Sequence, residues 1–235
     1  IMFVKQFNAG QICTNVDYVF VHESQKQAFV DEAKKYTAKH CPDINHEDYT
    51  SIIDERAFDR LEATLEDART KGASIVNLSG GQHSNRETRK IPMHLVLDTT
   101  ENMTIRQRET FGPFLMVMTY SKPEEVIDYI NDNDRPLALY PFTRNDELAA
   151  LYIERIMSGG VTVNDALFHV AQHDLPFGGV GASGMGHYHG YEGFVSFSKL
   201  RPVFYQANFS AMKYLRPPYG KFATKVFDFL MKHKS

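Results

Sequence analysis

The sequence predicts an α/β fold, in which an open three-layer sheet carries helices on both of its faces. Short runs of β-branched and aromatic residues alternate with segments whose apolar residues recur at helical spacing. At 235 residues the chain is long enough for one sizeable domain, or two small ones, with a real core. Its 43% hydrophobic and 23% charged residues are ordinary for a globular protein. These observations exclude a repeat, a fibrous or a low-complexity architecture.

The first half of the chain is expected to form a strand, two helices and two short strands. The β-branched and aromatic run VDYVFVH, residues 16–22, is typical of a strand. Residues 25–39 and 54–71 each place apolar side chains on one helical stripe. Shorter apolar runs at 73–78 and 93–97 then predict two strands.

The second half begins with a stronger strand candidate, FLMVMTY, residues 114–120. A helix should follow, with Ser121 as its N-cap, Pro123 in its first turn and Glu124 completing a capping box. A further helix is expected from Asn145. The run GGVTVND, which is residues 159–165, then predicts a short strand.

The chain changes character after this strand. Seven of its fifteen glycines lie between Gly178 and Gly193, which predicts a closely packed loop rather than a regular element. Residues 179–184 satisfy G-x-G-x-x-G, but no strand precedes them, the following glycines are poor in a helix, and no acidic residue lies about 20 positions on. A dinucleotide-binding loop is therefore rejected here.

We expect two parts in the chain, a domain over 1–200 and a C-terminal tail over 201–235. In the tail, residues 221–233 place Phe222, Val226, Phe229 and Leu230 at helical spacing. This amphipathic helix could dock on the domain, bind a partner or lie on a membrane surface. Docking is favoured, because most amphipathic helices cover a core.

Composition limits the partners and the compartment. A net charge of −3 argues against a partner held by nucleic-acid phosphates. Two cysteines are too few for a secreted disulfide framework, which predicts a reducing, cytoplasmic location. No apolar run approaches the ~20 residues of a membrane helix. The first residue is Ile1 rather than Met, which predicts a domain cut from a longer chain.

The candidate nucleophile is Cys13, the last residue of FNAGQIC, where a turn of small residues delivers one thiol before a strand. A catalytic cysteine needs a base, a positive neighbour or a helix N-terminus, and only Lys5 lies near it in sequence. A second candidate segment, ETFGP, contains Glu109 and Phe111 at a Gly-Pro turn before a strand. Taken alone, Cys13 fits a buried core cysteine better, and Cys41 fits a structural or exposed thiol.

Ten histidines raise the question of a metal. His169 and His173 lie four residues apart, and His187 and His189 form an H-x-H pair. A zinc site needs three or four converging ligands, and neither HExxH nor CxxC occurs. No metal site is therefore expected.

Three segments, FNAGQIC, ETFGP and PFGGVGASGMG, in this order and spacing, resemble the catalytic domain of aldehyde dehydrogenases. The resemblance covers essentially the whole chain. Residues 164–194 and the string LRPPYGK near the C-terminus are most similar to the coniferyl aldehyde dehydrogenase branch. The resemblance implies the fold of that catalytic domain.

The resemblance also implies roles for particular residues. Cys13 would attack the aldehyde, giving a thiohemiacetal and then a thioester. Glu109 would hydrogen-bond the nicotinamide ribose, with Phe111 beside the ring. Phe177 and Asn164 would lie along the substrate tunnel.

By the same resemblance, the Rossmann domain, the general-base glutamate and an oxyanion-hole asparagine lie upstream of residue 1. The implied cofactor is NAD or NADP. The implied substrate is a bulky aldehyde, such as an aromatic aldehyde of the coniferyl type. The parent protein is implied to be a homodimer or a homotetramer. The 235-residue chain alone is expected to lack useful dehydrogenase activity.

Two alternatives stay open at this point. A cysteine hydrolase or acyltransferase would acylate Cys13 directly and would need a histidine base beside it, and no motif supplies one. A catalytically silent aldehyde-dehydrogenase-like module would serve assembly only, and the intact Cys13, Glu109 and Phe177 argue against it.

Overall fold

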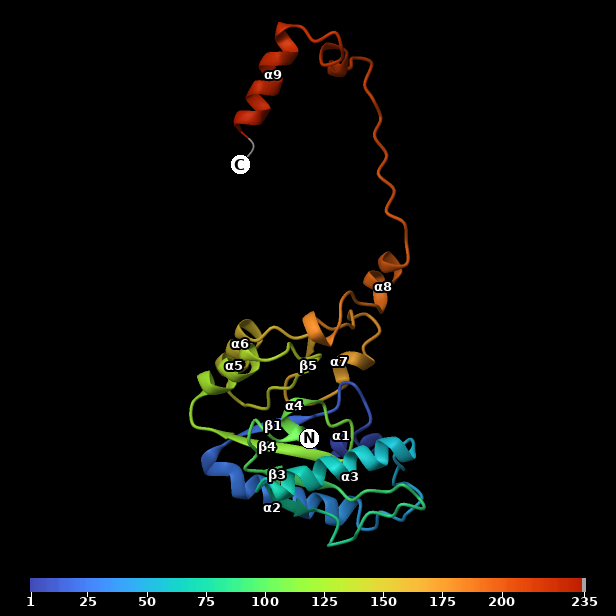
Figure 1. Cartoon of the computed structure of the whole chain (residues 1–235), viewed down its shortest axis with the longest axis vertical. Coiled ribbons are helices and arrows are strands. Elements are labelled where there is room, and N and C mark those ends of the chain that lie inside the picture. The colour runs from blue at the N-terminus through green and yellow to red at the C-terminus, as the bar shows by residue number, and fades with distance from the viewer. Residues whose placement is uncertain (234–235) are drawn as a thin grey trace. The chain divides into compact units, whose positions relative to one another are not determined.

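The computed structural model describes residues 1–233, and the chain divides into two compact units, Ile1–Phe197 and Ser198–Ser235 (Figure 1). The first half of unit 1 contains α1 (Met2–Gln6), η1 (Phe7–Gly10), β1 (Tyr18–His22), η2 (Glu23–Gln25), α2 (Lys26–His40), α3 (Glu55–Thr70), β2 (Ser74–Asn77), β3 (His94–Leu97) and α4 (Thr104–Gln107). Its second half contains β4 (Phe114–Tyr120), α5 (Pro123–Asp132), β5 (Ala138–Leu139), α6 (Asp146–Arg155), β6 (Gly160–Val161), α7 (Phe168–Ala171), η3 (Gly181–Ser183) and α8 (Gly190–Ser196).

The strands form two sheets. The larger sheet has the order β1-β4-β3-β2, with β1, β4 and β3 parallel and β2 antiparallel to β3. The smaller sheet is the parallel pair β5-β6. Each predicted strand is present, although the run at 159–165 forms only the two residues of β6.

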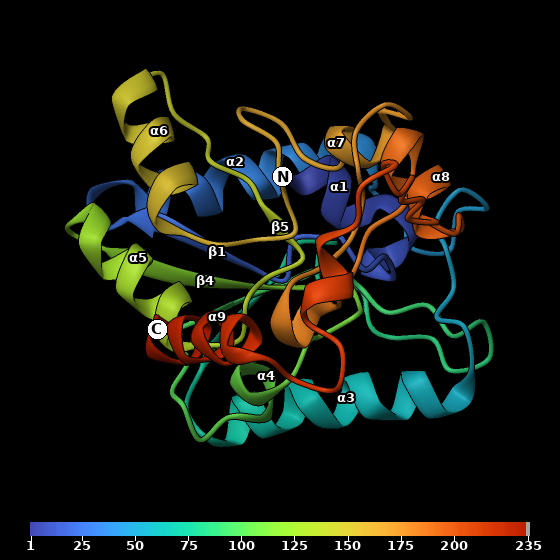
Figure 2. The same ribbon diagram turned by 90° about the horizontal axis from the view of Figure 1, so that it is seen from above.

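Helices cover both faces of the larger sheet, which confirms the predicted α/β class. In β4, Leu115 and Val117 join the cluster that contains α1 and α2, whereas Phe114 and Met116 join the cluster that contains α3. This alternation follows from the two-residue period of a strand. Figure 2 accordingly shows α2 and α3 on opposite sides of β1 and β4. A third cluster joins α5 to residues of α6.

One predicted cap is wrong in detail. Helix α5 begins at Pro123 with Lys122 as N-cap, so Ser121 lies one residue outside the predicted position. Ser121 still contacts the helix, because its Oγ donates to Glu125 Oε1 at 2.7 Å and its N–H donates to Glu125 Oε2 at 3.1 Å. The reciprocal partner is therefore Glu125 rather than Glu124. By contrast, the predicted start of the next helix is confirmed to within one residue, because α6 begins at Asp146. Asn145 is its N-cap, and its side chain accepts from the Leu148 N–H at 3.1 Å.

The glycine-rich segment is closely packed, as predicted, but it is not all loop. A Cβ added to Gly178 would lie 2.1 Å from the Gly186 carbonyl oxygen, and one added to Gly179 would lie 2.0 Å from that of Ser183. The prediction fails at the end of the segment, where Gly190 opens helix α8. Gly190 has φ +54°, a conformation that glycine adopts without the cost to a Cβ-bearing residue.

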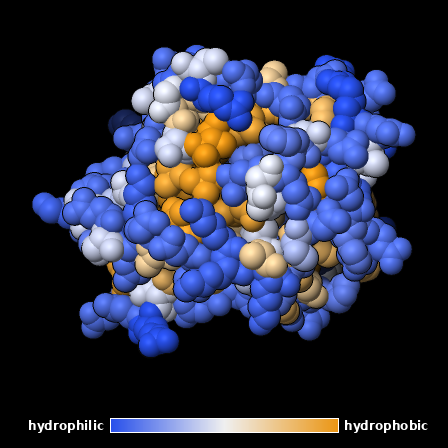
Figure 3. Space-filling model, turned by 90° about the horizontal axis from the view of Figure 1, so that it is seen from below, coloured by the Kyte–Doolittle hydropathy of each residue, from blue (hydrophilic) through white to orange (hydrophobic). Residues whose placement is uncertain are grey.

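The second unit contains η4 (Ala211–Tyr214) and α9 (Lys221–Lys232), the helix that the spacing in the tail predicts. Large side chains of α9 are exposed, with Phe222 at 61% and Phe229 at 60%. Residues 234–235 of the predicted tail lie outside the described residues. Within residues 1–233, no helix is long and apolar enough to cross a membrane. The face shown in Figure 3 is mainly hydrophilic around one hydrophobic patch.

Candidate active site

The turn that presents Cys13 is a sharp, strained backbone segment. Three consecutive residues, Asn8, Ala9 and Gly10, have positive φ angles of 53°, 51° and 78°. Left-handed conformations cost non-glycine residues about 1–2 kcal/mol each, so surrounding contacts must hold this turn. One contact is internal, because the Asn8 Nδ2 donates to the Gln11 carbonyl at 2.9 Å. Cys13 follows the turn as an exposed free thiol.

The side chain of Gln11 ties the turn to a distant segment. Its Nε2 donates to the Ser51 carbonyl at 3.1 Å, and its Oε1 accepts from the Ile53 N–H at 2.9 Å. Both partners lie just before α3. The glutamine of the motif therefore positions the segment that presents Cys13.

The loop that contains Glu109 is held by two charged side chains from other elements. Asp17, just before β1, accepts from the Thr110 N–H at 2.9 Å. Arg60 of α3 donates to the carbonyls of Thr110 at 2.8 Å and Phe111 at 3.3 Å. Hydrogen bonds to charged groups are stronger than neutral ones, at about 1.5–3 kcal/mol, so they can maintain a strained loop. Phe111 itself has φ +46° and is 40% exposed.

The two loops interlock through glycine. A Cβ added to Gly10 would lie 2.0 Å from the Gly112 carbonyl oxygen, and one added to Gly112 would lie 2.4 Å from Leu61 Cδ2. The contact at Gly10 is with backbone atoms and leaves no room for a side chain, so the backbones of the two motifs touch. At Gly112 the neighbour is the side chain of Leu61 in α3. The structure thus brings the predicted residues Cys13 and Glu109 into one region.

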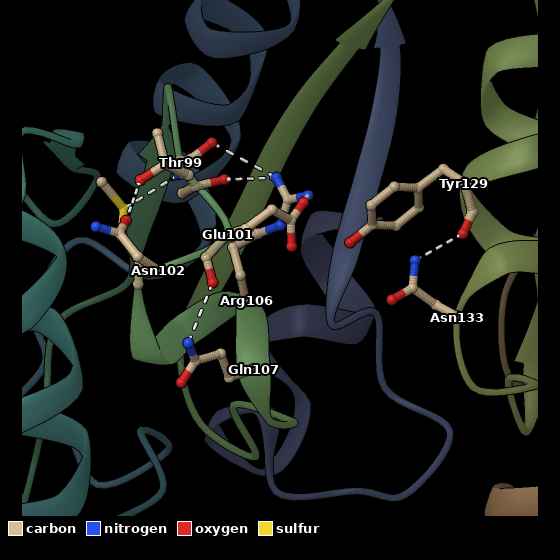
Figure 4. A network of polar contacts seen from close by, with 9 residues as sticks. Thr99, Glu101, Asn102, Arg106, Gln107, Tyr129 and Asn133 are labelled. Atoms are coloured by element: carbon tan, nitrogen blue, oxygen red, sulfur yellow. Dashed lines mark hydrogen bonds and ion pairs between the residues drawn. The ribbon is translucent and has the colours of Figure 1, made fainter.

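Helix α4, just before Glu109, is anchored by Arg106 (Figure 4). The guanidinium pairs with Glu101, bonds the Thr99 hydroxyl at 3.3 Å and lies 5.1 Å from the centre of the Tyr129 ring. Tyr129 belongs to α5, so Arg106 links the approach to the Glu109 loop with the helix that follows β4.

A buried lysine lies among the charges beneath these loops. Lys5 of α1 is 1% exposed, and burial lowers its pKa to about 8, against the opposing influence of Asp17 and Glu109. Desolvation raises the pKa of Glu109, and the neighbouring Asp17 carboxylate raises it further, while Lys5 and Arg60 lower it. Lys5 therefore remains largely cationic at neutral pH and balances the two carboxylates.

Cys13 and Glu109 both line a cavity of about 570 Å³. Its other walls come from the start of β1, from α5, and from the segment around β5, and they include Asp17, Phe20, Val126, Ile130, Asp134, Leu139, Tyr140 and Ser183. Phe111, Asn164 and Phe177 do not line this cavity. The structure therefore gathers two of the five predicted site residues at one cavity.

Phe177 reaches the cysteine segment through a row of ring contacts. It is 9% exposed and its ring centre lies 6.3 Å from that of His169. The His169 ring lies 5.9 Å from that of Tyr140, whose hydroxyl donates to the Thr14 carbonyl at 2.7 Å. Thr14 is the residue after Cys13, so the row ends at the backbone of the cysteine segment.

His169 is held in place by Thr162. The His169 Nδ1 lies 2.8 Å from the Thr162 Oγ1, and burial lowers the pKa of the imidazole. The histidine is therefore neutral at physiological pH. Asn164 is held differently, with φ +59° and its Oδ1 accepting from the Thr143 N–H at 2.8 Å.

Sequence reasoning missed three of the residues that shape this region, which are Asp17, Arg60 and Tyr140. It considered His169 only as a metal ligand. The signal for Asp17 was an acidic residue just before a strand, and for Arg60 a basic residue on the apolar side of a helix. Neither signal distinguishes a loop anchor from an ordinary surface charge. Within residues 1–233, no group of three or more His, Cys, Asp or Glu side chains is placed to hold a metal ion.

Comparison with known proteins identifies relatives over nearly the whole chain. The chain is 46% identical to a probable coniferyl aldehyde dehydrogenase of Caulobacter vibrioides, over 94% of this chain and 47% of that protein. It is 40% identical to a coniferyl aldehyde dehydrogenase of Pseudomonas sp. strain HR199, over 94% of this chain and 47% of that protein. The chain therefore spans about half the length of the curated relatives it matches.

Solved structures show the same similarity. The substrate-bound state of Staphylococcus aureus AldH superposes with a TM-score of 0.80 at 34% identity, over 97% of this chain and 49% of that chain. An aldehyde dehydrogenase from Bacillus cereus in complex with NAD+ superposes with a TM-score of 0.73 at 25% identity, over 83% of this chain and 40% of that chain. Residues 1–203 match the family described as the aldehyde dehydrogenase family. The family match covers most of the chain, and the relatives named above match it over nearly its whole length. The chain therefore belongs to the aldehyde dehydrogenase family.

Proposed function

We propose that this chain is the thiol-bearing catalytic portion of an NAD(P)-dependent aldehyde dehydrogenase. One observation supports this most strongly: Cys13 and Glu109, from two motifs far apart in sequence, line the same cavity on loops whose backbones touch. A nucleophile and a cofactor-orienting carboxylate must be held close together for a reaction between substrate and cofactor.

In the proposed reaction, the Cys13 thiolate forms a C–S bond to the aldehyde carbon, and the carbonyl oxygen becomes an oxyanion. A backbone N–H at Cys13 can donate to that oxygen. Loss of a hydride oxidises the carbon by two electrons and leaves a thioester on Cys13. Water then adds to the thioester, the C–S bond breaks, and the acid and the thiolate are released.

The residues present fit a nicotinamide cofactor. When bound, the cofactor supplies the hydride acceptor. The Glu109 carboxylate lies at the cavity and, when ionised, accepts hydrogen bonds only, as the hydroxyls of a ribose require. Asp17 and Arg60 hold the backbone on either side of Thr110, which fixes where the Glu109 carboxylate and the Phe111 ring lie.

The general base, the Rossmann domain and the side-chain oxyanion donor are proposed to lie in the half of the polypeptide that this chain does not span. Loss of a general base costs roughly 10²–10⁴ in rate, and loss of an oxyanion donor costs roughly 10²–10³. We therefore propose that the 235-residue chain has no useful dehydrogenase activity by itself. Formation of NADH or NADPH by the purified chain would contradict this.

The proposed substrate is a bulky aldehyde, with coniferyl-type aldehydes as the first to test. This rests on the two relatives named as coniferyl aldehyde dehydrogenases, at 46% and 40% identity. The segment 201–235 is proposed to dock or to contribute to a homodimer or homotetramer, because α9 exposes Phe222, Phe229 and Leu230.

The test uses the longer polypeptide and follows cofactor reduction with NAD+ and NADP+, using cinnamyl-type and aliphatic aldehydes. Cys13→Ser should abolish turnover, at least a thousandfold, because an alcohol is a far weaker nucleophile than a thiolate. Cys41→Ser, at the partly buried second cysteine, is the matched control and should retain activity. Absence of cofactor reduction while Cys13 still reacts with acyl esters would favour a cysteine hydrolase, although no hydrogen bond joins Cys13 to a histidine within residues 1–233.

A further inference from the structure

We propose that helix α9 binds an anionic lipid surface, lying in the plane of the headgroups with its apolar side toward the acyl chains. The proposal goes beyond the dehydrogenase chemistry and does not depend on it. It assigns a role to α9 alone and leaves the rest of the segment 201–235 for the docking or oligomer contact proposed above.

The first observation is an uneven distribution of charge along the chain. Residues 198–235, the second unit, contain eight of the 26 Lys and Arg residues but only one of the 29 Asp and Glu residues. Their formal net charge is therefore +7, and residues 1–197 have a formal net charge of −10 within the total of −3. Clusters of Lys and Arg on or beside an amphipathic helix are typical of segments that bind anionic lipids.

The charged and the apolar residues of α9 lie on opposite sides of the helix. At roughly 100° per residue, Lys221, Lys225 and Lys232 fall within one narrow sector, with Asp228 beside them. Seven of the twelve residues form a wide apolar arc on the other side, which consists of Phe222, Ala223, Val226, Phe227, Phe229, Leu230 and Met231. A basic polar face opposite a face of Phe and Leu is the pattern of helices that lie in a membrane interface.

The large side chains of this apolar arc are exposed. Phe222 is 61% exposed, Phe229 is 60% exposed and Met231 is 76% exposed. In α3, by contrast, the apolar residues Phe58 and Leu61 are 3% and 0% exposed. Helix α3 therefore covers its apolar side within the first unit, whereas the apolar arc of α9 is available to an external surface.

Two tyrosines of the second unit extend the apolar arc toward its opposite margins. The Tyr214 ring centre lies 6.1 Å from that of Phe222, and the Tyr219 ring centre lies 5.9 Å from that of Phe227. Both tyrosines are more than half exposed, at 51% and 62%. Because tyrosine combines an apolar ring with a polar hydroxyl, it favours the boundary between headgroups and acyl chains.

The position of the lysines distinguishes a lipid surface from a protein surface. If α9 covered a protein core, its apolar arc would be buried and its lysines, on the opposite side, would face solvent. In a bilayer interface the lysine side chains extend to the anionic headgroups while the arc reaches the acyl chains, so both sides of the helix contribute. A helix that binds a protein groove also uses a narrower stripe of anchors, at i, i+3 or i+4 and i+7.

The lysines predict the size of the lipid preference. Each lysine near an anionic surface favours binding by a factor of about five, so three lysines give a preference of roughly a hundredfold at most. Salt should weaken this preference, because the Debye length falls to about 3 Å at about 1 M ionic strength. The apolar arc supplies the part of the affinity that salt does not weaken.

The test measures binding of the longer polypeptide to sedimented vesicles. One set contains phosphatidylcholine alone, and in the other about one third of it is replaced by phosphatidylglycerol. We expect at least tenfold tighter binding to the anionic vesicles, and loss of most of this difference at about 1 M NaCl. Equal binding to both sets at low salt, or binding to neither, would overturn the proposal.

A first pair of variants tests the lysines. Lys221→Gln together with Lys225→Gln should weaken binding to the anionic vesicles roughly 25-fold, and the fold should be unaffected because both residues are exposed. Lys34→Gln together with Lys39→Gln, at two exposed residues of α2, is the matched control and should leave binding within about twofold. An equal loss in the control would show that general charge, rather than α9, determines binding, and would overturn the proposal.

A second variant tests the apolar arc. Phe222→Ser together with Phe229→Ser should weaken binding to the anionic vesicles at least tenfold, because both rings would leave water on binding. The oligomeric state in analytical ultracentrifugation should not change. Dissociation of the oligomer by this variant would assign the arc to a subunit contact and would overturn the proposal. Cofactor reduction by the same samples tests the proposed function separately, since an inactive polypeptide that binds anionic vesicles would refute only the dehydrogenase.

Discussion

The loops around Cys13 and Glu109 and the glycine-rich segment after Asn164 both contain family motifs, but they are held in different ways. Gln11, Asp17 and Arg60 bind backbone groups 40 or more residues away in sequence. The glycine-rich segment is held by neighbours, since Ser183 bonds Val180 and Phe177 pairs with Tyr188. The first region is fixed by the fold of the whole sheet, whereas the second is fixed mainly by its own packing.

This difference predicts how far from the substituted residue the structural effect of a substitution should extend in each region. A change in the first region should disturb the sheet and the cavity together, because its anchors lie just before β1, at Asp17, and in α3, at Arg60. A change in the glycine-rich segment should remain local. The following predictions test this contrast, in decreasing order of expected effect.

Gly10→Ala should have the largest effect. The added Cβ would lie 2.0 Å from the Gly112 carbonyl oxygen at a residue with φ +78°, so the two loops must separate. We expect a loss of several kcal/mol of unfolding free energy, about 3 or more, measured by urea denaturation. Gly186→Ala is the matched control, because Gly186 has φ +71° but nothing within 4 Å of its added Cβ. Equal losses in the two variants would refute the interlocking of the loops.

Acidification should weaken the first region through His94. The His94 side chain belongs to a residue that is only 6% exposed, and burial lowers the pKa of the imidazole to about 4. The backbone N–H of His94 donates to the Pro113 carbonyl at 3.0 Å, which connects this residue to the Glu109 loop. The unfolded chain takes up a proton near pH 6.5 and the folded chain only near pH 4. The stability due to the neutral imidazole is therefore lost as pH falls between these values, by up to roughly 3 kcal/mol at about 1.4 kcal/mol per pKa unit.

The measurement is the unfolding free energy at a series of pH values, for the parent chain and for His94→Gln. The difference between the two should shrink as pH falls from 6.5 to 4. A difference that stays constant over this range would show that His94 does not contribute to the acid sensitivity.

Arg60→Met should loosen the Glu109 loop without destroying the fold. Arg60 donates to the carbonyls of Thr110 and Phe111, and neither carbonyl gains a replacement donor from methionine. In the longer polypeptide we expect about a tenfold rise in KM for the nicotinamide cofactor, equivalent to about 1.4 kcal/mol, with a smaller change in KM for the aldehyde. Arg56→Met, at an exposed residue of the same helix, should change neither. A uniform fall in kcat alone would contradict a positioning role.

Ser183→Ala should give the smallest effect, confined to the glycine-rich segment. The Ser183 Oγ accepts from the Val180 N–H at 2.9 Å and donates to the Val180 carbonyl at 3.0 Å. Losing these neutral bonds should cost about 1 kcal/mol. Ser183 lines the same cavity as Cys13, but the hydrogen bonds that hold the cysteine turn do not involve it. The rate at which Cys13 reacts with iodoacetamide should therefore stay within about twofold. A large change in that rate would show that the two regions are coupled.

Much of the fold was predictable because the strong patterns are local. The strand Phe114–Tyr120 and the helix Glu55–Thr70 follow from periods of two and 3.6 residues in the sequence. The helix at Gly190 was missed because glycine is a poor helix former, and here packing outweighs propensity. The position of Ser121 was misjudged by one residue because Pro123 sets the first turn.

The candidate site was predictable only where a motif marked it. Cys13 and Glu109 stand in distinctive strings, and the structure places both at one cavity. Asp17 and Arg60 act through backbone groups more than 40 residues away, and no local pattern records such a contact. The division of the strands into two sheets could not be predicted either, because a short apolar run does not indicate which sheet its strand will join.

Phe111 shows how laboratory evolution could mislead. Its left-handed backbone, at φ +46°, is a conformation that a bulky L-residue adopts at a cost and glycine adopts freely. A screen that rewards heat resistance alone would therefore favour Phe111→Gly, which relieves this cost and removes a 40% exposed ring from the surface. The selected variants would be more stable to heat but would lack the ring proposed to lie beside the cofactor. Selection at this position should therefore require both turnover and heat resistance.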